Sequence, residues 1–166
     1  MKVLLIRHAV AEEPAAFKKT GMPDDVRPLT VEGRRKMRRA AEGLTRVIEK
    51  LDLIATSPLV RAVETAHIIA KSYPKVPVAE LEALAPGGKP ESIFRFLVQQ
   101  GQNVVALIGH EQDLGKLVCL SIGSKVLDRA PIKKGGAVLI EFDGPVVAGA
   151  GTLRLMLTPQ ILRRLA

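Results

Sequence analysis

The chain has 166 residues, of which 47% are hydrophobic and 25% are charged. This composition excludes a disordered chain, and the length fits one domain over residues 1–166 with a hydrophobic core of ordinary size. The single cysteine, Cys119, excludes an internal disulfide and a thiolate metal cluster, and its apolar surroundings predict a buried side chain.

Much of the net charge of +8 comes from the basic run over residues 34–39. This run lies within a predicted helix, and glutamates at positions 32, 42 and 49 dilute it, which favours a solvated helix face. The alternative is a basic patch that attracts phosphorylated or acidic partners. Nucleic-acid binding is not expected, because no aromatic residues are interleaved with the positive charges.

The beginning of the chain does not resemble a secretion signal. The apolar run over residues 3–6 ends at Arg7, which makes it too short for a signal core. No stretch approaches the ~20 apolar residues of a membrane span. We therefore expect a cytoplasmic protein with no membrane contact.

In the first half of the chain, strands and helices are predicted to alternate. Residues 3–6 form an apolar run typical of a buried parallel strand, and residues 12–29 are rich in Pro, Gly and Asp, as loops are. Thr30 is placed to cap a helix over residues 32–51. A strand follows at residues 53–56. Ser57-Pro58 then predicts the start of a helix that runs to about residue 71, with Ser57 as the cap.

The second half continues the same alternation. The patterns predict strands at residues 77–81, 104–108, 136–142 and 152–157, and helices at residues 90–100, 111–122 and 160–165. Alternating strands and helices are typical of an α/β fold. We therefore predict a three-layer α/β sandwich around a mostly parallel central sheet.

Polar clusters follow three of the predicted strands. They are Arg7-His8, residues 57–61 and residues 109–111. Ligands of such folds bind at the carboxyl ends of the strands, so we expect these clusters to converge. Together they supply two arginines and two histidines but no acidic ligand set, so we expect no metal and no other cofactor. Guanidinium groups instead suit the paired oxygens of a phosphate group.

The chemistry of that set points to covalent catalysis on phosphate. A neutral His8 could attack phosphorus, while the arginines stabilise charge on the phosphate oxygens. His110 could donate a hydrogen bond to one of those oxygens, and a bound anion would favour its cationic form.

Three motifs in order carry a family resemblance. Residues 5–9 (LIRHA) resemble the Arg-His-Gly signature of the histidine phosphatase superfamily, which has the phosphoglycerate-mutase-like fold. Residues 57–66 (SPLVRAVETA) resemble its Ser-Pro-x-x-Arg-Ala-x-x-Thr-Ala segment, and Gly109-His110 resembles its late Gly-His element. The resemblance implies that His8 is the nucleophile and that Arg7, Arg61 and His110 form the phosphate pocket.

Within this superfamily the chain is most similar to the SixA-like branch of small phosphohistidine phosphatases. The similar features are residues 26–30 (VRPLT), the short length and the turn at residues 85–87. Two positions depart from the superfamily pattern. Ala9 replaces the usual glycine, which is compatible with an ordinary negative φ. Pro14 stands where mutases carry an asparagine, so mutase activity is not expected.

The sequence leaves two questions open: which residue, if any, is the general acid, and what Arg27 does. Glu82 or Glu111 could be the general acid, or the reaction could need none, because a phosphohistidine substrate has a nitrogen leaving group. Arg27 could contact the phosphate, or it could anchor a loop through an ion pair.

The expected activity is hydrolysis of phosphohistidine on a protein through a phosphohistidine intermediate on His8. The alternative substrate is a small phosphate ester or anhydride, cleaved by the same mechanism. A non-catalytic phosphate-binding module is a third hypothesis, which the presence of His8 disfavours. We expect the protein to be a monomer.

Overall fold

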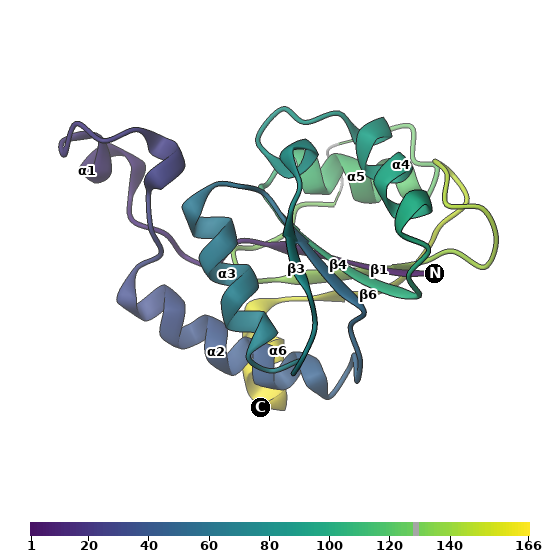
Figure 1. The fold of residues 1–166 in the computed structure, drawn as a ribbon, viewed down its shortest axis with the longest axis horizontal. Coiled ribbons are helices and arrows are strands. Elements are labelled where there is room, and N and C mark those ends of the chain that lie inside the picture. Colours follow the sequence, from purple (N-terminus) through teal and green to yellow (C-terminus); the bar gives the residue numbers. More distant parts are fainter. Residues whose placement is uncertain (128–129) are drawn as a thin grey trace.

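The computed structural model describes residues 1–127 and 130–166, along which strands and helices alternate (Figure 1). The strands are β1 (Lys2–Arg7), β2 (Leu53–Thr56), β3 (Val78–Glu80), β4 (Val104–Gly109), β5 (Ala137–Glu141) and β6 (Thr152–Leu157). The α-helices are α1 (Pro14–Lys18), α2 (Val31–Thr45), α3 (Val60–Ala70), α4 (Pro90–Gln100), α5 (Asp113–Ser121) and α6 (Pro159–Leu165). Two short 3-10 helices are η1 (Asp24–Val26) and η2 (Glu82–Leu84).

The strands form one sheet in the order β3-β2-β4-β1-β5-β6. The pairs β3–β2, β2–β4 and β4–β1 are parallel, whereas β5 runs antiparallel to both β1 and β6. Five of the six strands therefore point the same way, which confirms the prediction of a mostly parallel sheet.

Helices cover both faces of the sheet, so the fold has three layers. Alternate residues of β1 enter different cores: Leu4 and Ile6 pack on the side of α2, α3 and α6, and Val3 and Leu5 on the side of α4 and α5. Figure 1 shows these two helix groups on opposite sides of the sheet. Cys119 of α5 lies in the second core and is buried, as predicted.

The helix predicted over residues 32–51 ends early. Thr30 caps it as predicted, because its hydroxyl accepts a hydrogen bond from the Gly33 amide at 2.8 Å. The helix α2 nevertheless ends at Thr45, and the chain continues as a turn. Ile48 and Leu51 remain buried in the core. The apolar periodicity of these two residues therefore predicted their burial correctly, but it did not predict that the helix ends before them.

The helix predicted to begin at Ser57-Pro58 begins instead at Val60, with Leu59 at the cap position. The Ser57 amide donates to the carbonyl of Ile108 at 2.9 Å, so Ser57 still follows the path of β2 beside β4. The predicted loop over residues 12–29 also contains regular structure, namely α1 and η1.

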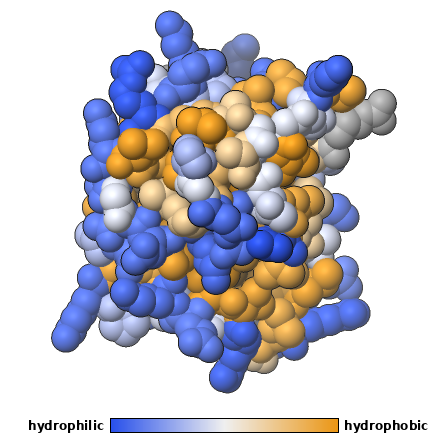
Figure 2. Space-filling view, turned by 90° about the vertical axis from the view of Figure 1, so that its right-hand side faces the viewer, coloured by the Kyte–Doolittle hydropathy of each residue, from blue (hydrophilic) through white to orange (hydrophobic). Residues whose placement is uncertain are grey.

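The strands β1, β2 and β4 end at one edge of the sheet, and the segment that carries α1 and η1 projects beyond this edge (Figure 1). The opposite end, where β1 begins, presents hydrophobic patches among hydrophilic side chains (Figure 2). Among the residues that the structure describes, no helix is long and apolar enough to cross a membrane.

Candidate active site

The three polar clusters meet where β1, β2 and β4 end. The His8 amide donates to the carbonyl of Gly109 at 3.0 Å, which ties the residue after β1 to the end of β4. The imidazole rings of His8 and His110 lie 5.2 Å apart, centroid to centroid, and are tilted by 55°. Parallel strands that end together therefore bring the two histidines to one site, as the sequence predicted.

His8 is held as a neutral imidazole with a defined tautomer. Its Nδ1 lies 2.7 Å from the carbonyl oxygen of Ala9, and because a carbonyl only accepts, Nδ1 carries the proton. Burial lowers the pKa of His8 to about 3, and the nearby cations Arg61 and Arg7 add to this effect. The Nε2 lone pair is consequently present at neutral pH, as a nucleophile requires.

His110 is also neutral in this site. Its Nε2 lies 2.8 Å from the Ser57 hydroxyl. Burial lowers its pKa to about 4, with a smaller contribution from Arg61. The cationic form expected from the sequence therefore requires a bound anion, whose charge would raise this pKa again.

Arg61 extends from the first turn of α3 and is 4% exposed. Its Nη1 donates to the Asp24 carbonyl at 2.9 Å, and its Nη2 lies 3.2 Å from the Asp24 carboxylate. Arg7, at the end of β1, donates from Nη1 to the Ile132 carbonyl at 2.9 Å. The same nitrogen lies 3.4 Å from the Glu111 carboxylate.

Both arginines keep an unsatisfied donor. Among the described residues, Arg7 Nε and Arg61 Nε are the buried side-chain nitrogens or oxygens without a hydrogen-bond partner. Native proteins rarely leave buried donors unpaired, so this concentration on two arginines marks a site where internal pairing is incomplete. An anion with several oxygens is the ligand class that such donors suit.

Arg27 lies close to the site but is engaged in holding the loop. It is 7% exposed, and its Nε donates to the Asp24 carboxylate at 2.7 Å. Its Nη1 donates to the carbonyl of Glu12, also at 2.7 Å. Of the two roles open in the sequence, these contacts favour the loop anchor over a phosphate contact.

The two candidate acids lie in different settings. Glu111 accepts hydrogen bonds from the Arg7 guanidinium and from the Ile132 amide, the latter at 2.8 Å. Its carboxylate therefore holds these two groups in place. Glu82 begins η2 and is exposed, and no hydrogen bond joins it to the site residues within the described parts of the chain. An acid role for either residue stays a prediction.

Three residues have supporting roles that the sequence analysis did not predict. Thr65 accepts from the Ala9 amide at 3.0 Å and donates to the Arg61 carbonyl at 2.7 Å, so it joins the backbone after His8 to α3. Ser57 contacts His110 rather than capping a helix, and Asp24 bridges Arg27 and Arg61. Thr65 could have been identified, because it lies one helical turn after Arg61 within the motif of residues 57–66.

Ala9 adopts the backbone conformation that the sequence allowed. Residues with positive φ other than glycine are Lys75 and Gln112 in the described chain, so Ala9 is not among them. The departure from glycine therefore causes no backbone strain beside His8.

A known protein family matches the first half of the chain. The model of the histidine phosphatase superfamily, branch 1, matches residues 3–86, which is half of the chain. The chain belongs to this superfamily. Its members are phosphatases, and the matched range contains Arg7, His8 and Arg61, whereas His110 lies beyond it.

One curated relative and one solved structure are similar to most of this chain. An uncharacterized protein of a Picosynechococcus strain is 30% identical over 123 residues, which cover 70% of each chain. The solved structure of the protein histidine phosphatase SixA complexed with tungstate has a TM-score of 0.81 and 25% identity. That match covers 98% of this chain and 99% of the other.

A mycobacterial glucosyl-3-phosphoglycerate phosphatase complexed with VO3 has a TM-score of 0.74 and 13% identity, and the match covers 95% and 99% of the two chains. This second structure shows the shared fold alone. The chain is therefore a SixA-like member with the phosphoglycerate-mutase-like fold.

The buried histidines of this superfamily member should make it acid-labile. Their pKa values of about 3 and 4 lie below the ordinary 6.5, so the unfolded chain binds protons first as the pH falls below 6.5. The free energy of unfolding should therefore decrease as the pH falls. At pH 4, His8 alone should account for about 3 kcal/mol of this loss. Urea unfolding at pH 7 and pH 4 measures this loss.

The variant His8→Gln should lose less stability between these pH values than the wild type does. The exposed His67 provides a matched control, because His67→Gln should lose as much as the wild type. Equal losses in all three proteins would show that His8 is not held neutral by the fold.

Proposed function

We propose that the protein hydrolyses phosphohistidine on a protein substrate, through a phosphohistidine intermediate on His8. The observation that carries the proposal is the setting of His8, a neutral imidazole beside two arginines whose Nε donors have no hydrogen-bond partner in the described parts of the chain. The likeness to SixA along almost the whole chain supports the substrate class.

In the first step, His8 Nε2 attacks phosphorus while the bond from phosphorus to the leaving nitrogen breaks. The proton stays on His8 Nδ1, which donates its hydrogen bond to the Ala9 carbonyl throughout, so the phosphorylated ring carries the positive charge that arises. Arg7 and Arg61 stabilise the charge on the transferring phosphoryl oxygens, and His110 donates to one of them.

In the second step, a water molecule attacks the phosphorus atom, and the bond to His8 Nε2 breaks. The bond's electron pair returns to Nε2, which restores the neutral imidazole, and the protons of the water leave with the dihydrogen phosphate product. Covalent catalysis of this kind divides one displacement into two easier ones.

The site is better suited to a nitrogen leaving group than to an alkoxide. An imidazole that carries its other N–H leaves phosphorus as a neutral molecule, so it needs no proton donor. An alkyl ester leaves as a strongly basic alkoxide, which needs a general acid. The Glu111 carboxylate is engaged by Arg7 and the Ile132 amide, and Glu82 is exposed, so neither candidate acid is poised for that task.

A small phosphate ester is the second candidate substrate, because the fold is shared with a phosphatase of a glucosyl phosphoglycerate. Phosphate release should be compared for a phosphohistidine peptide, para-nitrophenyl phosphate and glycerol 3-phosphate. Under the proposal, the phosphohistidine peptide is cleaved fastest and the nitrophenyl ester, whose leaving group is weakly basic, more slowly. Glycerol 3-phosphate should be cleaved at least about 100-fold more slowly than the peptide, the usual contribution of one general acid.

Efficient cleavage of glycerol 3-phosphate would assign the protein to small esters and would require an acid near His8. No release from the phosphohistidine peptide, with release from an ester, would reject the protein substrate while keeping the His8 mechanism.

A further inference from the structure

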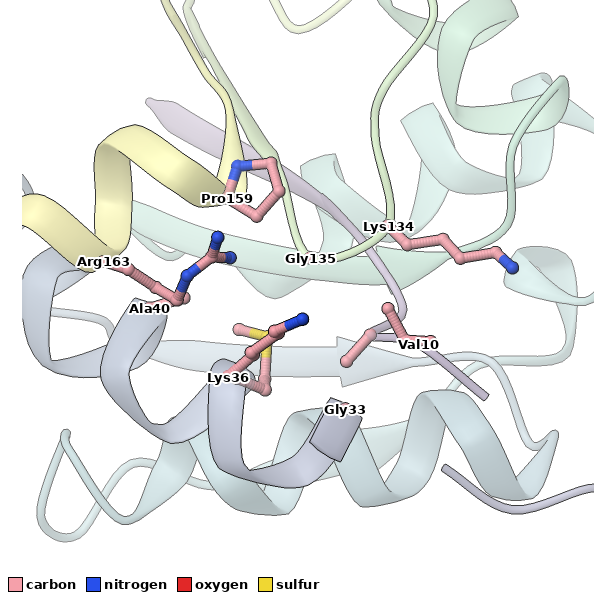
Figure 3. Close-up of a pocket in the computed structure, with 10 residues that line it drawn as sticks. Val10, Gly33, Lys36, Ala40, Lys134, Gly135, Pro159 and Arg163 are labelled. Carbon is pink, nitrogen blue, oxygen red and sulfur yellow. The ribbon is translucent and has the colours of Figure 1, made fainter. Parts of the chain in front are cut away.

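A pocket lies between α2, α6 and the turn before β5, at the same edge of the sheet as His8 (Figure 3). Its volume is about 160 Å³. Apolar side chains contribute much of its wall: Ala9, Val10, Met37, Ala40 and Pro159. Three cationic side chains complete it: Lys36, Lys134 and Arg163.

The pocket shares backbone with the active site. Ala9 and Val10 directly follow His8, and the amide of Gly135 donates to the carbonyls of Arg7 and His8 at 3.0 and 3.2 Å. Ile6 pairs with Ala137 across β1 and β5, and Ala137 pairs with Leu157 across β5 and β6. With adjacent strands about 4.8 Å apart, the pocket wall at the end of β6 lies about 10 Å from the end of β1.

The charge of the pocket is of one sign. Its lining contains three cations and no carboxylate. Lys36 lies 3.3 Å from Glu32, one turn away on α2, whereas no ion pair joins the side chains of Lys134 or Arg163 to the residues that the structure describes. Figure 3 shows the charged groups of Lys36 and Arg163 extending over the pocket and Lys134 reaching outward on the side of Val10.

We infer that this pocket binds an acidic side chain of the phosphorylated protein substrate, an Asp or Glu near the phosphohistidine in the substrate's sequence or fold. The inference rests on the proposed function. The volume equals that of about five water molecules, which suits one short side chain but not a nucleotide. The apolar wall would contact the methylene groups, and the cations at the rim would pair with the carboxylate.

The spacing fits a nearby residue of the same substrate. A residue three positions from the phosphohistidine lies about 10 Å away in an extended chain, at ~3.3 Å per residue. The basic run of residues 34–39, which the sequence left open between a solvated face and an acidic-partner site, would then contribute Lys36 to substrate recognition.

The test uses two phosphohistidine peptides that differ only in carrying glutamate or glutamine at positions two and three on both sides of the histidine. The wild type should prefer the glutamate peptide about fivefold in kcat/KM, and the preference should shrink at high salt. Lys134→Gln and Arg163→Gln should each reduce this ratio toward one. Taking the ratio within each variant cancels any general effect on catalysis.

The sequence neighbours of Lys134 and Arg163 provide matched controls. Lys133 and Arg164 are exposed and do not line the pocket, so Lys133→Gln and Arg164→Gln should keep the wild-type preference. Equal kcat/KM for the two peptides in the wild type would overturn the inference and leave the proposed function standing. An equal loss of preference in the control variants would overturn it too, because the charge effect would then be general.

A binding measurement separates this inference from the proposed function. The unphosphorylated glutamate peptide should shift the amide NMR signals of Gly33 and Gly135, which line the pocket, more than its glutamine twin does. This shift, without turnover of either phosphopeptide, would support the pocket and reject the activity. Free glutamate that shifts the same signals as strongly as the peptide would overturn the inference, because the pocket would then bind small carboxylates.

Discussion

Replacing His8 with alanine should reduce phosphate release by about 10⁴-fold or more, the scale on which removal of an enzyme nucleophile acts. The imidazole Nε2 is the atom that would form the covalent intermediate, and water cannot replace it without losing the two-step route. Binding of tungstate should change much less, because Arg7 and Arg61 remain to contact the anion. Steady-state kinetics and calorimetric titration with tungstate measure the two effects.

The intermediate itself provides a second measurement for this variant. Rapid acid-free quenching of the wild type with a radioactive phosphohistidine peptide should leave label on the protein, and His8→Ala should leave none. His67→Ala is the matched control, because His67 is exposed on α3, and it should keep both turnover and labelling.

Full turnover by a folded His8→Ala protein would place the nucleophile elsewhere. Absence of turnover in the wild type, with tungstate bound in both proteins, would favour the non-catalytic phosphate-binding module.

The central strands could be predicted because each one is a short apolar run buried on both faces. Residues 3–6, 53–56 and 104–108 were expected as strands, and β1, β2 and β4 contain them. The convergence of Arg7, His8, Arg61 and His110 followed from the same pattern, because the carboxyl ends of parallel strands share one edge. The place where these four residues come together was therefore visible in the local sequence.

The parts that could not be predicted depend on contacts between distant segments. Serine is a typical helix-capping residue, yet Ser57 contacts His110, which lies 53 positions away in the sequence. Ile48 continues the apolar periodicity of α2, but it lies after the turn that ends this helix and is buried there in the core. Asp24 approaches Arg61 only because the segment over residues 12–29 folds back over the edge of the sheet. Propensity describes the backbone near a residue, and tertiary packing overrides it at such positions.

Replacing Arg61 with alanine should lower kcat/KM by about 10³-fold, the scale on which loss of one preorganised donor group acts on a developing negative charge. The loss has two physical sources. The guanidinium no longer stabilises the phosphoryl oxygens, and the Asp24 carboxylate, which lies 3.2 Å from Arg61 Nη2, no longer has this cation to offset its repulsion of the phosphate.

The double variant Arg61→Ala/Asp24→Asn separates these two sources. Removing the Asp24 charge should restore about tenfold of the lost kcat/KM, because it removes the repulsion without replacing the donors. Arg38→Ala, on the exposed surface of α2, lowers the net charge by the same amount and should leave kcat/KM near the wild-type value.

A loss confined to KM would assign Arg61 to uniform binding of substrate and transition state, and a loss in kcat assigns it to the transition state. If Asp24→Asn restored nothing in the Arg61→Ala background, the Asp24 charge would not act on the phosphate. Its role would then be confined to holding Arg27 and the segment over residues 12–29 in place at the edge of the sheet.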